Sequence, residues 1–297
     1  MLTDDILRLK EEQNAVILVH NYQTGPIQDI ADLLGDSLEL SRAAARTNAE
    51  VVLFCGVDFM AETAAILSPK KRVIMPEAGA SCPMAQMITA QNLIEFKKKR
   101  PLAAVVCYVN STAEVKAESD ICCTSANGVE VVNSLAEDEV IFVPDRNLAH
   151  YVSRHTENKI IPWDGYCYVH DRYTREDVRK ARTPHPKAEL LVHPECRPEV
   201  VDEADYVYST SGILRHVQES DAGEFIIGTE VGMNYRLKKE APKKEFYPLS
   251  KGAVCLDMKK TTLTKVQKAL ETLEPRVVVP KDVADRARSA IERMLAV

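Results

Sequence analysis

The sequence predicts an α/β protein made of three homologous three-layer α/β/α domains with parallel sheets. Short apolar runs, which we expect to be strands, alternate with amphipathic segments along most of the chain. This alternation is typical of parallel sheets that carry helices on both faces. The predicted strands occupy residues 16–19, 51–54, 104–109, 139–143, 189–193 and 224–228, and the amphipathic segments include residues 26–34, 113–117 and 199–204.

Four landmarks recur in the same order in three parts of the chain, which indicates an internal triplication. The first is a polar residue that ends an apolar run, and a hydroxyl residue follows it by 17 positions. An acidic residue comes 20 or 21 positions later, and a cysteine lies 59 or 62 positions after the first landmark. The three sets are His20, Ser37, Asp58 and Cys82; Tyr108, Ser125, Asp145 and Cys167; and His193, Thr210, Glu230 and Cys255.

The repeat predicts the domain organisation. Residues 1–90, 91–174 and 175–260 form three α/β repeats, each with one of the cysteine loops. Residues 261–297 form a helical tail that we expect to pack back on the first domain, with residues 276–280 as a strand of an incomplete fourth unit. In open parallel sheets ligands bind beyond the carboxyl ends of the strands, where every landmark lies. We therefore expect a pseudo-threefold arrangement of the domains around a central site.

Charge and composition argue against several classes of protein. The formal net charge is -6 and no basic stripe occurs, so nucleic-acid binding is not expected. The N-terminal segment has early acidic residues and no apolar region, unlike a signal peptide, and no apolar run approaches the roughly 20 residues that span a bilayer. We therefore expect a cytoplasmic protein without membrane contact.

Eight cysteines are too few for a disulfide scaffold in a chain of 297 residues. Cys196 lies at a strand end, but Gln23 and Ser111 occupy its equivalent positions in the other repeats, so we expect it near the site and not as a ligand. Cysteines in or beside apolar runs are expected to be small buried hydrophobes; these are Cys55, Cys107, Cys122 and Cys123.

Cys82, Cys167 and Cys255 lie in predicted loops, each with a glycine two or three residues before it. The chain has no CxxC, which excludes a zinc ribbon and a ferredoxin-type run. Spacing alone leaves three interpretations open: a [4Fe–4S] cluster with three cysteine ligands, a zinc site with three cysteine ligands, or three unrelated loop cysteines. In the first, one iron is open to water or substrate, which suits a Lewis acid.

The chain resembles the quinolinate synthase family over essentially its whole length. The motifs that carry the resemblance occur in family order. They include HNYQ (20–23), GVDFMAE (56–62), CPMA (82–85), YVNSTAEVKAESD (108–120), PDRNLAHYV (144–152), GYCYVHD (165–171), HPEC (193–196) and IGTEVGM (227–233).

The resemblance implies a transferase of de novo NAD biosynthesis that condenses iminoaspartate with dihydroxyacetone phosphate to form quinolinate, phosphate and water. It implies one [4Fe–4S] cluster per chain at the junction of three α/β/α domains, with an open-site iron as Lewis acid. The implied ligands are Cys82, Cys167 and Cys255. The implied pathway is compatible with a transient contact with an aspartate-oxidising enzyme, for which the sequence carries no signal.

The resemblance also implies a set of substrate contacts. We expect Glu195, Tyr22 and His20 to be catalytic, with Glu195 and Tyr22 transferring protons. His20 and His193 can be charged near neutral pH, and that charge would offset the negative ligands. The three hydroxyl landmarks are expected to bind anions at strand-to-helix turns. The full set is His20, Tyr22, Ser37, Tyr108, Asn110, Ser125, His170, His193, Glu195 and Thr210.

Two other functions stay compatible with the sequence. An aconitase-like iron–sulfur hydro-lyase would share the open iron but act on a single hydroxy acid. A non-enzymatic iron–sulfur sensor would use loss of its cluster as a signal. A requirement for dihydroxyacetone phosphate separates the synthase from the hydro-lyase, and a partner-binding surface would mark the sensor.

Overall fold

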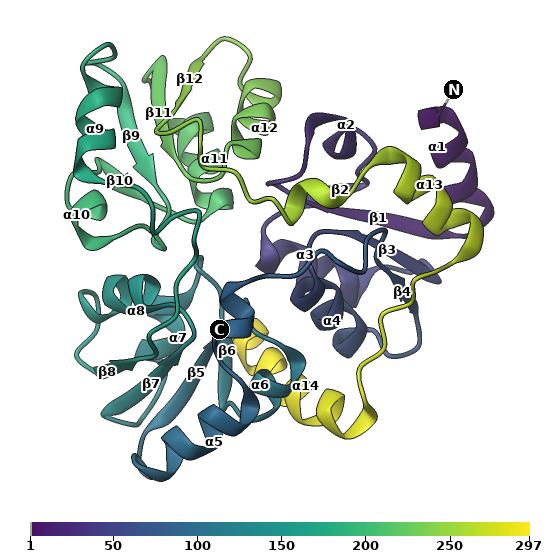
Figure 1. Ribbon diagram of the computed structural model, residues 1–297, viewed down its shortest axis with the longest axis horizontal. Helices are drawn as coiled ribbons and strands as arrows, with labels where there is room; N and C mark the ends of the chain where they lie inside the picture. Colours follow the sequence, from purple (N-terminus) through teal and green to yellow (C-terminus); the bar gives the residue numbers. More distant parts are fainter. Residues whose placement is uncertain (1) are drawn as a thin grey trace.

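The computed structural model describes residues 2–297 and contains three four-stranded parallel sheets, one in each of three lobes around a common centre (Figure 1). The strand orders are β2–β1–β3–β4, β6–β5–β7–β8 and β10–β9–β11–β12, so the same connection pattern occurs three times. The predicted α/β class with three parallel-sheet units is thereby confirmed. Each sheet falls within one predicted repeat, while the boundaries at residues 90, 174 and 260 stay a prediction.

Each lobe alternates short strands with helices. The first contains α1 (Leu2–Glu12), β1 (Ala15–His20), α2 (Gly25–Gln28), β2 (Leu33–Gly35), α3 (Ser37–Arg46), β3 (Val51–Cys55), α4 (Asp58–Leu67), β4 (Arg72–Ile74) and the 3₁₀ turn η1 (Met84–Met87). The second contains α5 (Ala90–Lys98), β5 (Ala104–Tyr108), α6 (Ala113–Ala117), β6 (Ile121–Cys123), α7 (Gly128–Asn133), β7 (Glu139–Val143), α8 (Arg146–Ser153) and β8 (Lys159–Pro162). The third contains α9 (Arg175–Arg182), β9 (Glu189–Val192), α10 (Pro198–Val201), β10 (Tyr206–Val207), α11 (Thr210–Glu219), β11 (Glu224–Gly228), α12 (Gly232–Glu240), β12 (Glu245–Pro248) and the 3₁₀ turn η2 (Met258–Lys260).

The two central strands of each sheet carry the core. β3 and β5 are buried along their whole length, as expected for parallel strands covered on both faces. The edge strands are shorter and mostly more exposed, and the apolar runs did not predict them. The segment 26–34 also differs from expectation, because α2 ends at Gln28 and the chain then turns into edge strand β2.

The triplication extends to individual hydrogen bonds. In each lobe the aspartate directly before the second strand accepts the backbone N–H of a residue near the start of the first strand. Each of these bonds ties the residue before the second strand to the first strand of the same sheet. The pairs are Asp32 with Ile17 at 2.8 Å, Asp120 with Val105 at 2.7 Å and Asp205 with Leu190 at 2.7 Å.

The C-terminal tail packs on two lobes rather than one. Helix α13 (Leu263–Thr272) lies against α1 of the first lobe, as expected (Figure 1). Helix α14 (Lys281–Ala296) packs mainly on α6 and β6 of the second lobe, with a smaller contact to α4, so the expectation of a tail on the first domain is wrong for this helix. Its buried face combines Ala287 and Ala290 with Ile291 and Met294, and the small alanines allow close approach.

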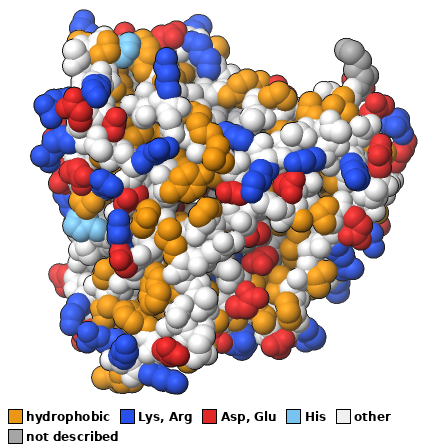
Figure 2. Space-filling view, viewed as in Figure 1, with side chains coloured by type: hydrophobic (Ala, Val, Ile, Leu, Met, Phe, Trp, Pro, Cys, Tyr) orange, Lys and Arg blue, Asp and Glu red, His pale blue; other side chains and the backbone are white. Residues whose placement is uncertain are grey.

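The segment 276–280 does not form the strand of a fourth unit. Its contact with β4 is one isolated antiparallel bridge between Arg276 and Ile74, beside which Val277 N donates to Val73 O at 2.9 Å, and the chain then enters α14. On the surface, Lys and Arg side chains intermingle with Asp and Glu across the face seen in Figure 2. Within residues 2–297, no helix is both long enough and apolar enough to cross a membrane.

Candidate functional site

A cavity lies where the carboxyl ends of the central strands of the three sheets converge. Side chains from all three lobes line it, together with apolar residues that include Val57, Phe59 and Met258. The structure brings every residue predicted as a ligand or substrate contact into this one lining: Cys82, Cys167, Cys255, His20, Tyr22, Ser37, Tyr108, Asn110, Ser125, His170, His193, Glu195 and Thr210. Their positions follow from the topology, and their roles stay predictions.

Equivalent turns after the first central strand of each lobe supply part of the lining. His20 ends β1 and its Nδ1 accepts the backbone N–H of Tyr22 at 3.2 Å. His193 follows β9 and its Nδ1 accepts the backbone N–H of Glu195 at 3.3 Å. The same turn in the second lobe carries Asn110 two residues after the end of β5. These bonds leave Nε2 of each histidine as the protonated nitrogen of a neutral ring.

The hydroxyl landmarks sit at the starts of helices. Ser37 and Thr210 are the first residues of α3 and α11, and Ser125 lies in the turn before α7. Thr210 Oγ accepts a hydrogen bond from Asn21 Nδ2 at 2.8 Å, and Ser125 Oγ lies 3.1 Å from His193 Nε2. Free backbone N–H groups at helix starts favour bound anions. No Lys or Arg lines the cavity among the described residues. Anionic groups of a ligand would therefore be bound by neutral hydrogen-bond donors of the lining.

The three loop cysteines form equivalent partly buried positions. All eight cysteines of the described chain are free thiols. Burial raises the pKa of Cys82, Cys167 and Cys255, and the thiols lie close enough for a charge on Cys255 to raise the pKa of the other two. Backbone N–H groups three residues further on, at Ala85, His170 and Met258, bond to the respective sulfurs and lower each pKa.

This donor set fits an iron–sulfur cofactor. Cysteine thiols from three loops line one cavity, and thiolates are the usual ligands of such clusters. Backbone N–H donors beside the sulfurs stabilise thiolate, and an apolar wall limits access of water. By contrast, Cys196 is buried in the third lobe, with its Sγ 3.5 Å from the carbonyl oxygen of Gly228, and it is absent from the described lining.

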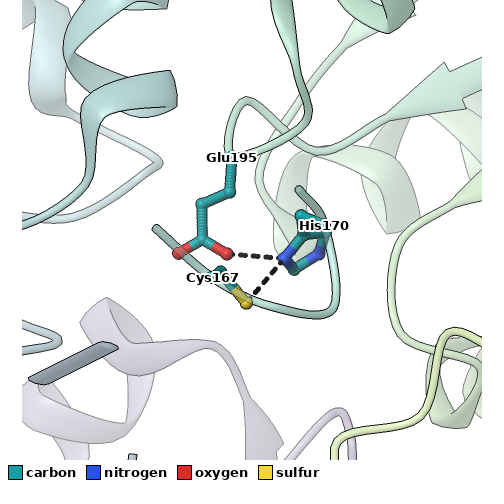
Figure 3. Close-up of side chains that lie close together, drawn as sticks. All are labelled: Cys167, His170 and Glu195. Carbon is teal, nitrogen blue, oxygen red and sulfur yellow. Dashed lines mark hydrogen bonds and ion pairs between the residues drawn. The ribbon is translucent and has the colours of Figure 1, made fainter. Parts of the chain in front are cut away.

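Among the described residues, Cys167, His170 and Glu195 form a cluster of possible metal ligands. One ligand atom from each lies within 4.8 Å of the others. His170 Nδ1 is 2.6 Å from Glu195 Oε2 and 3.2 Å from Cys167 Sγ (Figure 3). Cys167 and His170 come from one loop and Glu195 from the turn after β9, so tertiary packing of the second and third lobes creates this cluster (Figure 3).

Thr229 joins two predicted site residues and was not predicted itself. Its Oγ lies 2.6 Å from the Tyr22 hydroxyl and 2.9 Å from His170 Nε2. Its carbonyl oxygen accepts a hydrogen bond from the Tyr173 hydroxyl at 2.7 Å. The sequence signals that could have singled it out are its position directly before the acidic landmark Glu230 and its place in the motif IGTEVGM (227–233).

Burial strongly affects the protonation states of the titratable side chains that line the cavity. It lowers the pKa of His20 and of His193 to about 3, so the charge that both could carry near neutral pH is absent, because desolvation disfavours the imidazolium. Burial alone would raise the pKa of Glu195, but the adjacent His170 and a hydrogen bond from Tyr108 lower it, which keeps the carboxylate ionised. Burial raises the pKa of Tyr22 and Tyr108, and both phenols stay protonated.

The chain matches one protein family over nearly its whole length. A family model described as "Quinolinate synthetase A protein" matches residues 4–296. A curated relative from Methanoregula boonei, named quinolinate synthase, is 62% identical over 296 residues, which cover 100% of this chain and 98% of the relative. Relatives of the same name from Dehalococcoides mccartyi and Alkaliphilus metalliredigens are 55% and 52% identical over 297 residues, covering 100% of this chain and 98% of each relative. The chain therefore belongs to the quinolinate synthetase A family of enzymes.

Proposed function

We propose that this transferase of NAD biosynthesis condenses iminoaspartate with dihydroxyacetone phosphate to give quinolinate, phosphate and water. The observation that carries the proposal is the convergence of three equivalent cysteine loops with the ionised Glu195 and the neutral His20 and His193 in one cavity. Family membership supports the reaction, since the relatives are named quinolinate synthase.

In this proposal Cys82, Cys167 and Cys255 hold one [4Fe–4S] cluster. When bound, a cluster with three cysteine ligands supplies an open iron that can act as a Lewis acid. The cysteine loops come from three different lobes, and no fourth cysteine lines the cavity among residues 2–297. The ligand count follows from that arrangement.

The substrates and product carry carboxylates, and one substrate carries a phosphate, so the cavity must bind several negative charges. Three strand-to-helix turns, one in each lobe, present hydroxyls and backbone N–H groups at Ser37, Ser125 and Thr210. Neutral His20 and His193 add Nε2–H donors. The Oδ1 atom of Asn110 is buried without a partner among the described residues, which leaves it able to accept from a substrate N–H or O–H.

Glu195 and Tyr22 are placed for complementary proton transfers. The ionised Glu195 carboxylate can accept a proton, and the protonated Tyr22 phenol can donate one. His170 and Thr229 connect them through hydrogen bonds, which fixes both side chains relative to the cavity. The cytoplasmic location and a transient contact with an aspartate-oxidising enzyme stay predictions.

Anaerobically purified protein tests the proposal directly. We expect about four iron atoms per chain, as one such cluster contains. Quinolinate should form only when both iminoaspartate and dihydroxyacetone phosphate are present. Iron-loaded protein that dehydrates a single hydroxy acid and ignores dihydroxyacetone phosphate would instead identify a hydro-lyase.

A further inference from the structure

We propose that Asp58, Asp145 and Glu230 are positioning residues that hold the three cysteine ligands in place for the iron–sulfur cofactor. In each lobe, the acidic landmark accepts the backbone N–H of the cysteine of the same lobe. The distances are 3.3 Å from Cys82 N to Asp58 Oδ1, 3.2 Å from Cys167 N to Asp145 Oδ2 and 3.1 Å from Cys255 N to Glu230 Oε1. The inference rests on the proposed function only in taking these cysteines as the cofactor ligands.

Each carboxylate also accepts a backbone N–H from the start of the helix that follows the second central strand. A single side chain thus ties the cysteine loop to a helix that is anchored on the sheet. Because the same side chain holds both backbone N–H groups, it limits the movement of the cysteine loop relative to the helix. The second bonds run from Phe59 N to Asp58 Oδ1 at 2.8 Å, from Leu148 N to Asp145 Oδ1 at 2.7 Å and from Gly232 N to Glu230 Oε2 at 2.7 Å.

The repetition argues for a role at the cofactor rather than for local capping alone. A helix start needs a side-chain acceptor, but it does not need one that also reaches a cysteine 22 to 25 residues away. The third lobe makes both contacts with a glutamate, whose longer side chain also pairs with Lys259 Nζ at 2.9 Å. Groups behind metal ligands fix ligand orientation and typically matter about 10- to 100-fold for metal affinity.

The three carboxylates differ in a way that makes the proposal testable. Asp58 uses a single oxygen, Oδ1, for both backbone N–H groups. Asp145 and Glu230 use one oxygen for the cysteine and the other for the helix. An amide has only one oxygen, so Asp58→Asn can keep both bonds, whereas Asp145→Asn and Glu230→Gln must each lose one and turn an N–H donor toward another donor.

The measurement is the rate at which anaerobic, iron-loaded protein gives up its iron to a chelator, followed by the loss of visible absorbance. We expect Asp145→Asn and Glu230→Gln to lose iron roughly 10- to 100-fold faster than the wild type. Asp58→Asn should lose iron at close to the wild-type rate, while Asp58→Ala, at a partly exposed position, should lose it faster.

The matched control is Asp120→Ala in the second lobe. Asp120 also accepts a strand N–H, from Val105, but at the amino end of β5, away from the cavity. We expect it to lower the thermal unfolding temperature of the iron-free protein without changing the rate of iron loss. Circular dichroism identifies any variant that fails to fold. If Asp145→Asn or Glu230→Gln fails to fold, the difference in iron loss between Asp58→Asn and Asp58→Ala tests the proposal.

The reduction potential of the cluster gives a second readout that a purely structural role would not move. Removing a negative charge beside a ligand should make reduction easier, so Glu230→Gln should shift the potential to more positive values. The proposal would be overturned if all variants lost iron at the wild-type rate. It would also be overturned if all three amide variants lost iron equally faster than the wild type. Wild-type protein that binds no iron would instead refute the proposed cofactor.

Discussion

His170 Nδ1 lies 2.6 Å from Glu195 Oε2, and this contact links the Cys167 loop to the turn after β9. Both side chains are almost fully buried. His170 lowers the pKa of Glu195 against the opposing effect of burial, so the carboxylate enters the cavity ionised. One contact therefore joins the predicted cofactor loop to the predicted general base.

Replacing Glu195 by Gln should reduce catalysis while leaving the cofactor in place. The amide keeps the shape of the side chain but cannot accept a proton, and general-base catalysis contributes roughly 10²- to 10⁴-fold. We expect kcat for quinolinate formation to fall by that amount, with unchanged iron content. Glu199→Gln, a change at a partly exposed position on α10 outside the cavity lining, is the control and should leave kcat unchanged. An unaltered kcat in Glu195→Gln would remove Glu195 from the proton transfers.

Cys167→Ser and Cys196→Ser should separate a ligand from a buried bystander. Cys167 lines the cavity, whereas Cys196 points its thiol at the carbonyl of Gly228 inside the third lobe. We expect Cys167→Ser to abolish the brown colour and most of the bound iron, and Cys196→Ser to retain both. The measurement is iron per chain after anaerobic purification. The reverse result would assign the ligand to Cys196.

Thr229→Val should lower kcat/KM without reducing the amount of bound iron. The change keeps the shape of the side chain but removes the hydroxyl that bonds to Tyr22 and His170. Two neutral hydrogen bonds at about 1 kcal/mol each predict a loss of roughly ten- to thirtyfold in kcat/KM. Thr261→Val is the matched control, because the buried Thr261 hydroxyl has no partner in the described chain. Equal activity in both variants would show that the link through Thr229 is dispensable.

Asp171→Asn should lower the free energy of unfolding at neutral pH and should change it little in acid. The nearly buried Asp171 accepts hydrogen bonds from Arg146, Asn147 and Arg197, which lower its pKa despite burial. The folded pKa therefore lies below the unfolded value of about 3.9, and the stabilisation is complete above that pH and lost as pH falls through the folded pKa.

We expect urea unfolding of the iron-free Asp171→Asn protein at pH 7 to show a deficit of roughly 1.5–3 kcal/mol relative to the wild type. The deficit should shrink at pH 3. Asp164→Asn, which removes an exposed partner of the same Arg146, is the control and should cost less than about 1 kcal/mol. If the deficit in unfolding free energy did not change with pH, the stabilisation by Asp171 would come from the shape of its side chain rather than from its charge.

Apolar runs predicted the central strands and missed the edge strands. The six predicted runs correspond to β1, β3, β5, β7, β9 and β11, which are the inner pair of each sheet. Strands such as β8 and β10 are only partly buried, and their apolar stretches are too short to stand out in the sequence. The edge strand β6 is buried because α14 covers it, and this packing also explains why the tail does not lie wholly on the first lobe.

Much of the candidate site could be predicted because parallel strands place the residues at their carboxyl ends on one edge of a sheet. The landmark spacing alone therefore predicts that His20, Tyr108 and His193 share one central cavity, and all three line it. Thr229 escaped prediction, because a lone threonine after a strand has no distinctive pattern. The neutral state of His20 and His193 could not be predicted, because burial depends on how the lobes close over the rings.

The three α/β units, their central strands and the equivalent cysteine loops can all be predicted from the sequence alone. Apolar runs and their spacing are local properties that survive any arrangement of the lobes. The packing of the lobes is needed to see that Glu195 meets His170, that Thr229 joins His170 to Tyr22 and that His20 and His193 are neutral. These features require groups from different lobes to exclude water together, and desolvation is a property of the packed molecule.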